Sequence, residues 1–330
     1  MRQITALLIL LIPAALTAQF AGAPFRIGHS AYAASMGNAM VATSDAGMSG
    51  FNPALAANIG RRQVELSSAV MAFDRSLSAV TFSTPLPPAA GLTIGLVYSG
   101  VGEFDGRTVS GYPTERFSIY EARVFTQFGI RIGAKTQLGA GVTFSMADYG
   151  NNVNPATSVG LDLGLRRRLT DRLAFGLTAQ DLIASYTWNT QDLWGTIGSN
   201  QQVDRFPLRL KAGVEYIVRP DVLTLVAETE RRVLFASTTK TSVSTSLGEP
   251  VIVREVVDVT NAETLFRLGG QWHAHERFHV RMGIQSDSRL SGGFSLRLPL
   301  DRYAPSIDYS LSSEPSGFSS IHQFALRFQL

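Results

Sequence analysis

Apolar and polar residues alternate along most of the chain after residue 62, with the period of two that is typical of β-strands. In the segment 208–216, Leu210 and Val214 share one face with other apolar residues, whereas Arg209 and Lys211 lie on the opposite face. The same alternation runs through 137–147, 157–166, 278–285, 290–298 and 323–330. Because successive side chains of a strand point to opposite faces, the pattern predicts strands with one apolar and one polar face.

The predicted strands number about fourteen, at 63–73, 76–85, 91–101, 117–130, 136–148, 156–168, 172–181, 206–217, 221–231, 264–273, 277–286, 289–299, 304–312 and 321–330. Short links such as 132–135 and 169–171 alternate with a second set that contains every long link, including 102–116, 182–205 and 232–263. We expect the last of these to be a partly β-structured surface loop. Outer-membrane barrels have short turns on one rim and longer loops on the other. The sequence therefore predicts an all-β fold, a transmembrane antiparallel β-barrel with both termini at the short-turn rim.

Composition separates this prediction from a soluble β-sandwich, which would alternate in the same way. Charged residues make up only 17% of the 330 residues, where about a quarter is usual for a soluble domain. The predicted strands are about ten residues long, as membrane-spanning strands are. The net charge of +3 does not indicate a nucleic-acid partner, and the absence of cysteine excludes disulfides, thiolate metal sites and thiol nucleophiles.

The N-terminus predicts two segments ahead of the barrel. Arg2, the apolar run 4–16 and the small residues Thr17 and Ala18 have the order of a secretory signal peptide, predicted at 1–18. Residues 19–62 are rich in small side chains and are predicted to fold inside the barrel lumen as a plug. The transmembrane barrel then occupies 63–330. An exported barrel has outer-membrane lipid as its surroundings.

The predicted plug carries a motif. Met36 and Gly37 follow a run of small residues, and Asn52, Pro53 and Ala54 come after Phe51. This arrangement resembles the N-terminal signature of the PorV/PorQ family, a branch of the FadL-type barrels, although Asn38 and the direct Ala54–Leu55 step depart from it. Further similar segments, 102–106 and 320–324 among them, extend the resemblance over nearly the whole mature chain.

Inward-facing cations are the candidate ligand contacts of the barrel. They are Arg209, Lys211, Arg267, Arg281 and Arg297. A basic lumen attracts carboxylate ligands such as fatty acids. In the alternative interpretation, these side chains pair with groups of the plug or of neighbouring strands.

The long loop 182–205 holds three aromatic residues, Tyr186, Trp188 and Trp194, which are either membrane-interface residues or a docking surface for a partner. His273, His275 and His279 are predicted not to converge on a metal. No serine is predicted to lie near a histidine and an aspartate, so no enzyme activity, cofactor or metal is expected.

Two functions remain open. The PorV/PorQ resemblance implies a non-enzymatic accessory of type IX protein secretion or surface attachment, with secretion subunits or cargo C-terminal domains as partners of the extracellular loops. The alternative is a FadL-like transporter of hydrophobic or long-chain carboxylate molecules across the outer membrane, gated by the plug.

Overall fold

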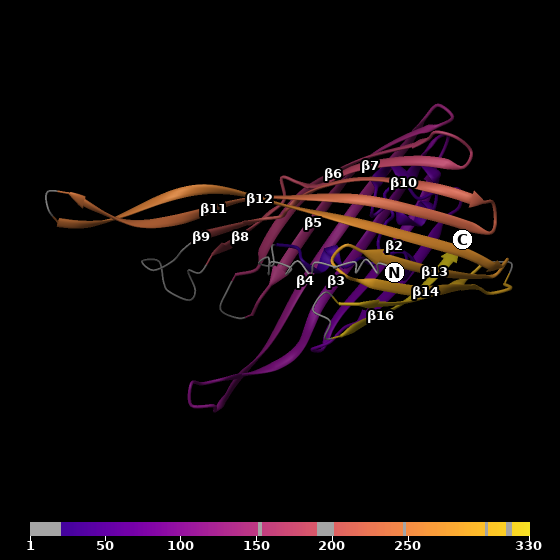
Figure 1. Ribbon diagram of the computed structural model, residues 1–330. Coiled ribbons are helices and arrows are strands. Elements are labelled where there is room, and N and C mark those ends of the chain that lie inside the picture. The colour runs from indigo at the N-terminus through magenta and orange to yellow at the C-terminus, as the bar shows by residue number, and fades with distance from the viewer. Residues whose placement is uncertain (1–20, 151–153, 190–200, 247–248, 301–302, 315–318) are drawn as a thin grey trace, which may run out of the picture.

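The computed structural model describes residues 21–330 apart from 151–153, 190–200, 247–248, 301–302 and 315–318. In this part of the chain, fourteen strands form one closed antiparallel barrel, as the sequence predicts (Figure 1). The barrel strands are β1 (Gln63–Val70), β2 (Arg75–Leu86), β3 (Ala90–Arg107), β4 (Pro113–Ile132), β5 (Thr136–Asp148), β6 (Ala156–Arg168), β7 (Leu173–Leu182), β10 (Leu208–Arg219), β11 (Leu223–Ser246), β12 (Glu249–His275), β13 (Phe278–Gln285), β14 (Leu290–Arg297), β15 (Ser306–Ser313) and β16 (Ser320–Gln329). Among the described helices, none has the length and apolar character needed to cross a membrane.

Burial alternates along the strands with the predicted period. In β10, Arg209 and Lys211 are buried inside the barrel, whereas Leu210 and Val214 are 44% and 37% exposed on the outside. The outward face of the other strands carries exposed Leu, Val, Ile and Phe side chains in the same way. An apolar outer surface around a polar interior is the arrangement that a lipid bilayer requires of a barrel.

The barrel closes between its first and last strands. β1 pairs with β16 from Gln63 opposite Gln329 to Val70 opposite His322. The Leu330 N–H donates to the Arg62 carbonyl oxygen at 2.8 Å, so both ends of the barrel lie at one rim. The β2–β3, β4–β5, β6–β7, β10–β11, β12–β13 and β14–β15 connections lie at this end, which we call the short-turn rim.

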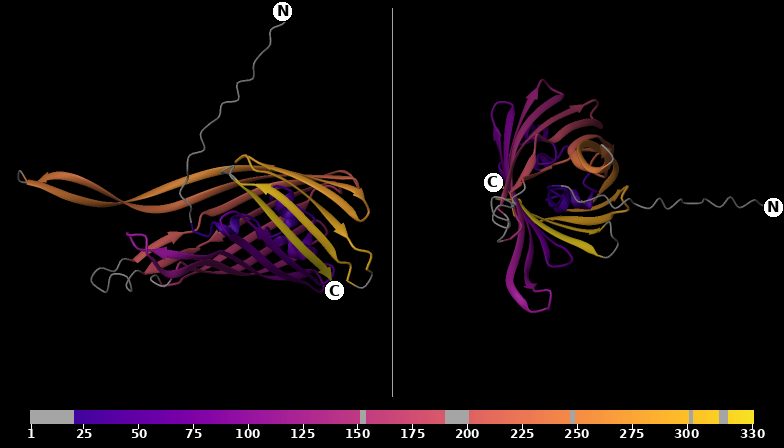
Figure 2. Two further views of the ribbon diagram at one scale, coloured as in Figure 1. Left: turned by 90° about the horizontal axis from the view of Figure 1, so that it is seen from below. Right: turned by 90° about the vertical axis from the view of Figure 1, so that its left-hand side faces the viewer.

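The opposite rim differs from the prediction in two loops. The 182–205 link contains a separate hairpin, β8 (Ser185–Asn189) and β9 (Gln201–Arg205). The 232–263 link is β-structured, as predicted, but over more of its length, because β11 and β12 stay paired until Ser246 faces Glu249. β10 follows β11 only as far as Val233, so the rest forms a two-stranded ribbon that projects far beyond the barrel (Figures 1 and 2).

Residues 21–62, the N-terminal segment, lie inside the ring of strands (Figure 2). The segment contains η1 (Pro24–Arg26), α1 (Ala31–Ser35), η2 (Ala46–Met48) and η3 (Pro53–Asn58). Asp45 caps η2 by accepting from the Gly47 N–H, and Asn52 caps η3 by accepting from the Ala54 N–H. Pro53 then begins η3 with a fixed φ where its missing N–H is no loss.

A band of inward-facing glycines lets the barrel wall approach the backbone of this segment. A Cβ added at Gly139 would stand 2.3 Å from the Pro53 carbonyl carbon and the Ala54 nitrogen, closer than real Cβ atoms come. Each member of this glycine band would bring a Cβ within 3.0 Å of the N-terminal segment: Gly91, Gly129, Gly139, Gly164, Gly176, Gly213, Gly269, Gly283 and Gly293. The polar face of the predicted strands is therefore rich in glycine because the segment fills the space that side chains would occupy.

Candidate functional site

The motif at Asn52 joins the N-terminal segment to itself and to the wall. The buried Asn52 amide donates to the Val41 carbonyl oxygen at 2.7 Å and to the Leu165 carbonyl oxygen of β6 at 3.2 Å. Its Oδ1 accepts from the Ala54 N–H at 3.1 Å. One side chain thus satisfies three buried backbone groups, which would otherwise be costly to bury.

Met36 and Gly37 anchor the other end of the motif. Met36 is 1% exposed and packs with Met40, Phe51 and Leu55 in an apolar cluster inside the barrel. Gly37 has a φ of +65° and lies against the β12 and β13 backbone, and its N–H donates to Ser291 Oγ at 3.2 Å. Only glycine adopts this φ freely and also leaves room for the wall.

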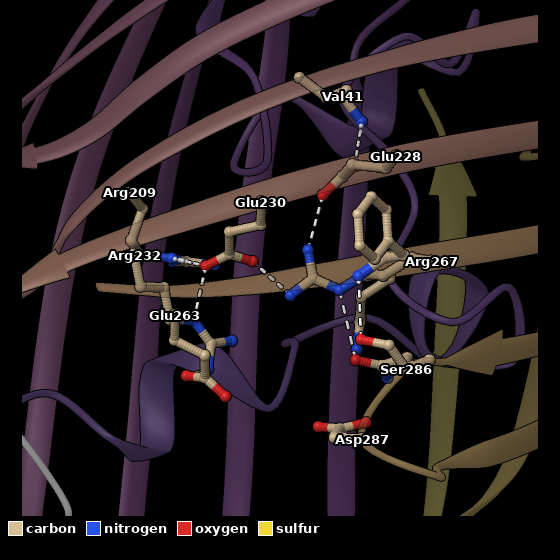
Figure 3. Close-up of polar contacts among 12 residues, drawn as sticks. Val41, Arg209, Glu228, Glu230, Arg232, Glu263, Arg267, Ser286 and Asp287 are labelled. Carbon is tan, nitrogen blue, oxygen red and sulfur yellow. Dashed lines mark hydrogen bonds and ion pairs between the residues drawn. The ribbon is translucent and has the colours of Figure 1, made fainter. Parts of the chain in front are cut away.

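A network of buried charges spans β10, β11 and β12 (Figure 3). Glu230 Oε1 accepts from Arg209 Nε at 2.8 Å and from Arg232 Nε at 2.9 Å. Arg267 donates to both Glu230 and Glu228, at 2.7 Å to the latter. The other oxygen of Glu228 accepts from the Val41 N–H at 3.0 Å, so the network ends on the N-terminal segment.

Two further arginines join the segment to the wall. Arg281 bonds Ser295 and lies 2.9 Å from Asp308, and its guanidinium stacks 4.1 Å from the Tyr32 ring centroid. Arg327 donates to Asp45 at 2.8 Å. Burial acts to raise the pKa of Asp45, but the charge of Arg327 and its hydrogen bond outweigh burial and lower that pKa below its ordinary value.

The five predicted ligand contacts therefore separate into three groups. Arg209, Arg267 and Arg281 form salt bridges with glutamate or aspartate, as the alternative interpretation of these cations predicts. Arg297, the last residue of β14, is exposed at the short-turn rim. Lys211 is 4% exposed and forms no salt bridge with any residue that the structure describes.

Lys211 borders an internal cavity of about 40 Å³, counting the space that the centre of a water molecule can reach. Its lining includes the aromatic rings of Phe25, Phe51 and Phe125 together with His29. The His29 ring stacks on Phe51 at 4.9 Å between centroids. Burial lowers the pKa of His29 to about 4, and the charges of Arg123 and Lys211 lower it in the same direction.

The aromatic residues predicted as a partner loop lie elsewhere. Tyr186 is 1% exposed, so the prediction that it docks a partner is wrong: its ring packs edge-on against Phe206, and its hydroxyl lies 3.3 Å from Glu121. Trp188 is half-buried and stacks on Tyr149 at 4.8 Å. Trp194 lies outside the described residues.

Histidine positions also differ from the prediction. His273 and His279 face each other across β12 and β13 with ring centroids 4.3 Å apart, whereas the sequence interpretation kept them separate. The described residues contain no group of three or more metal-binding side chains that could hold an ion. The structure therefore brings two histidines together, but they lack the further ligands that zinc sites use.

One serine lies beside a histidine in the described residues. Ser320 Oγ is 3.1 Å from His322 Nε2, and His322 Nδ1 is 2.9 Å from the Tyr309 hydroxyl. The three side chains lie on the outer face of β15 and β16. Tyr309 takes the place at which hydrolases use a carboxylate to orient and stabilise the histidine, so the group is not a complete catalytic triad.

Sequence reasoning missed Glu228, Glu230 and His29. Glu228 and Glu230 alternate with Ala227 and Thr229, so the period of two already assigns them to the inward face of their strand. No comparable signal marks His29, because its position depends on how the N-terminal segment folds against the wall.

Comparisons with known proteins support the fold. No protein-family model and no curated protein matches the chain. Among solved structures, the chain is similar to the toluene transporter TodX of Pseudomonas putida, with a TM-score of 0.59, 14% identity, and coverage of 91% of this chain and 97% of that one. It is also similar to the monoaromatic hydrocarbon channel CymD, with a TM-score of 0.58, 13% identity, and coverage of 92% and 96%.

A FadL homologue of Pseudomonas aeruginosa is a third similar structure, with a TM-score of 0.54, 12% identity, and coverage of 90% and 95%. At these identities the likeness is one of fold. The PorV/PorQ assignment stays a prediction, since no family model supports it. The structural neighbours of this chain are FadL-like outer-membrane barrels, among which TodX is named a transporter and CymD a channel.

Proposed function

We propose that the protein is a FadL-like channel for small hydrophobic molecules in the bacterial outer membrane. In this proposal residues 1–18 are a signal peptide, residues 19–62 form a plug, and residues 63–330 form the barrel. The observation that carries it is the N-terminal segment inside the barrel, which borders an internal cavity of about 40 Å³. That space holds a few water molecules, so passage of a larger molecule requires the segment to move.

The lining of the cavity supports a ligand with an apolar body and one negative group. Phe25, Phe51 and Phe125 supply aromatic surface, and Lys211 supplies an amino group that forms no salt bridge within the described residues. A buried ammonium with no carboxylate in direct contact attracts an anion, because the low dielectric of the interior strengthens the attraction. The proposal therefore includes hydrophobic carboxylates among the substrates.

Uptake in cells and in liposomes tests this function. We expect a deletion strain to lose uptake of a hydrophobic probe, and reconstituted protein to restore flux of a neutral aromatic and of a hydrophobic carboxylate. Lys211→Met should reduce flux of the carboxylate about tenfold or more, because it removes one hydrogen bond from a charged donor. Flux of the neutral probe should not change. Lys135→Met, at the exposed β4–β5 turn, is the matched control. Unchanged uptake in the deletion strain contradicts the proposal.

A secretion accessory of the PorV/PorQ type is the second candidate, and the projecting β11–β12 ribbon favours it. Beyond Val233 the ribbon has no further strand of the barrel along β11. An isolated two-stranded ribbon is only marginally stable in water, so a partner would stabilise it. A pull-down in mild detergent should then recover secretion subunits or cargo, and shortening the ribbon should abolish that recovery. Normal secretion by a deletion strain, with no partner recovered, rules this candidate out.

A further inference from the structure

A second cavity, of about 630 Å³, opens at the short-turn rim. Its walls come from β4, β5, β6, β7 and β10, from the turn between β6 and β7, and from Ser44 and Asn58 of the N-terminal segment. The volume lies within the range of small-molecule sites, about 300–1,000 Å³. This cavity, which we call the rim cavity, is separate from the internal cavity beside Lys211, since the two share no lining residue.

The rim cavity is strongly basic. Arg131, Arg166, Arg168 and Arg172 line it, against the two carboxylates of Asp171 and Glu215. Arg166 is paired with Glu215 at 3.1 Å. Glu215 also accepts from the Ser44 N–H at 2.9 Å, so its carboxylate is already bonded to Arg166 and to the N-terminal segment.

The other three arginines are not paired with a carboxylate in the part of the chain that the structure describes. Arg131 donates to the Ala57 carbonyl oxygen at 3.1 Å and Arg168 to the Ala134 carbonyl oxygen at 3.4 Å, and neither contact neutralises a guanidinium. Among the residues that the structure describes, no salt bridge joins Arg131, Arg168 or Arg172 to a carboxylate. Three positive groups therefore face the cavity with Asp171 as the one carboxylate not already paired.

The backbone that carries these arginines is ordered. Thr170 Oγ1 accepts from the N–H groups of Arg172 and Leu173, at 3.2 Å and 3.0 Å, which closes the β6–β7 turn. The Arg168 N–H donates to the Lys135 carbonyl oxygen at 2.9 Å and ties this turn to the next one. A fixed frame reduces the entropy that binding would otherwise lose in ordering a loop.

We propose that the rim cavity binds an oxyanion, a phosphate or carboxylate group, through Arg131, Arg168 and Arg172. The planar guanidinium presents paired donors that match the oxygens of such a group, and three of them around one concave space can neutralise a doubly charged anion. The group belongs either to a free organic anion or to the headgroup of an acidic lipid. The inference concerns a different site from the proposed channel and does not depend on it.

Binding to the full-length barrel in phosphatidylcholine nanodiscs tests the proposal. The probes are inorganic phosphate, glycerol 3-phosphate and dibutyryl phosphatidylglycerol, with dibutyryl phosphatidylcholine as the lipid without net charge. We expect saturable calorimetric binding of at least one acidic probe and none of the phosphatidylcholine. Binding of the free phosphates identifies a soluble anion as the ligand, whereas binding of phosphatidylglycerol alone identifies a lipid headgroup.

Two variants locate the site. Arg168→Gln with Arg172→Gln should weaken binding at least tenfold. Arg219→Gln with Arg277→Gln removes the same charge from other exposed turns of the same rim and should leave binding unchanged. As a test that needs no variant, bound probe should protect Arg168 and Arg172 from modification by phenylglyoxal, read by peptide mass spectrometry. Absence of saturable binding by every acidic probe, or equal losses in the two double variants, overturns the proposal.

Discussion

Replacing Gly139 by alanine should detach the N-terminal segment while leaving the barrel closed. The new Cβ would meet the Pro53 carbonyl carbon and the Ala54 nitrogen at 2.3 Å, and both are backbone atoms that cannot rotate away. Forcing such an atom into a packed interior costs about 1–3 kcal/mol. Shifting Ala54 also disturbs its hydrogen bond to Asn52, worth about 1 kcal/mol.

The two effects together destabilise the docked segment by about 2–4 kcal/mol, which multiplies the population of the released segment roughly 30-fold to 1,000-fold. The rate of trypsin cleavage after Arg26, followed on the intact protein by mass spectrometry, measures that population. Gly292→Ala is the control, because its Cβ would meet nothing closer than 3.8 Å. The reasoning is refuted if both variants are cleaved at the wild-type rate while the barrel keeps its heat-dependent mobility on a gel.

The remaining predictions concern single buried groups. Glu230→Gln leaves the buried guanidiniums around it without their counter-ion and should destabilise the barrel by about 3–5 kcal/mol. Glu263→Gln is the control, because its side chain is half-exposed and its loss should change barrel stability little. The temperature at which the barrel loses its heat-dependent gel mobility compares the two variants. Asn52→Ala should weaken docking by about 2–3 kcal/mol in the trypsin assay, with no change in barrel melting. Acidification should release the segment, because His29 has a pKa of about 4 when docked and 6.5 when free. The released segment therefore binds the proton at a higher pH than the docked one, so docking is strongest above pH 6.5 and weakens by at most about 3 kcal/mol as the pH falls to 4. His29→Gln should lack this pH dependence of docking. Equal pH profiles for the variant and the wild type contradict the prediction.

The alternation of residue types was enough to predict the barrel, because burial inside a strand follows the period of two whatever its neighbours are. It placed Arg209 and Lys211 inside and Leu210 outside, as the structure has them. It could not say which inward charges meet. That depends on the register between strands, which sets Glu228 opposite Arg267 and is decided by the closure of the whole barrel.

Two errors have the same physical origin. Tyr186 reads as an exposed loop residue, but the β8–β9 hairpin folds it against Phe206 and Glu121. His273 and His279 become neighbours through the pairing of β12 with β13, which ends in an irregular register beyond His273. In both cases the position of the side chains depends on contacts between segments that are distant in sequence, and the local residue pattern does not predict such contacts.

Arg327 links the seam of the barrel, where β16 pairs with β1, to the N-terminal segment inside it. It lies on the closing strand β16 and contacts Glu65 of the opening strand β1 at 2.9 Å and Asp45 of the N-terminal segment at 2.8 Å. The same guanidinium therefore bonds the first strand and the N-terminal segment together. An empty barrel would close on an arginine that had lost one of its two carboxylates, so the docked segment stabilises the seam without being required for its closure.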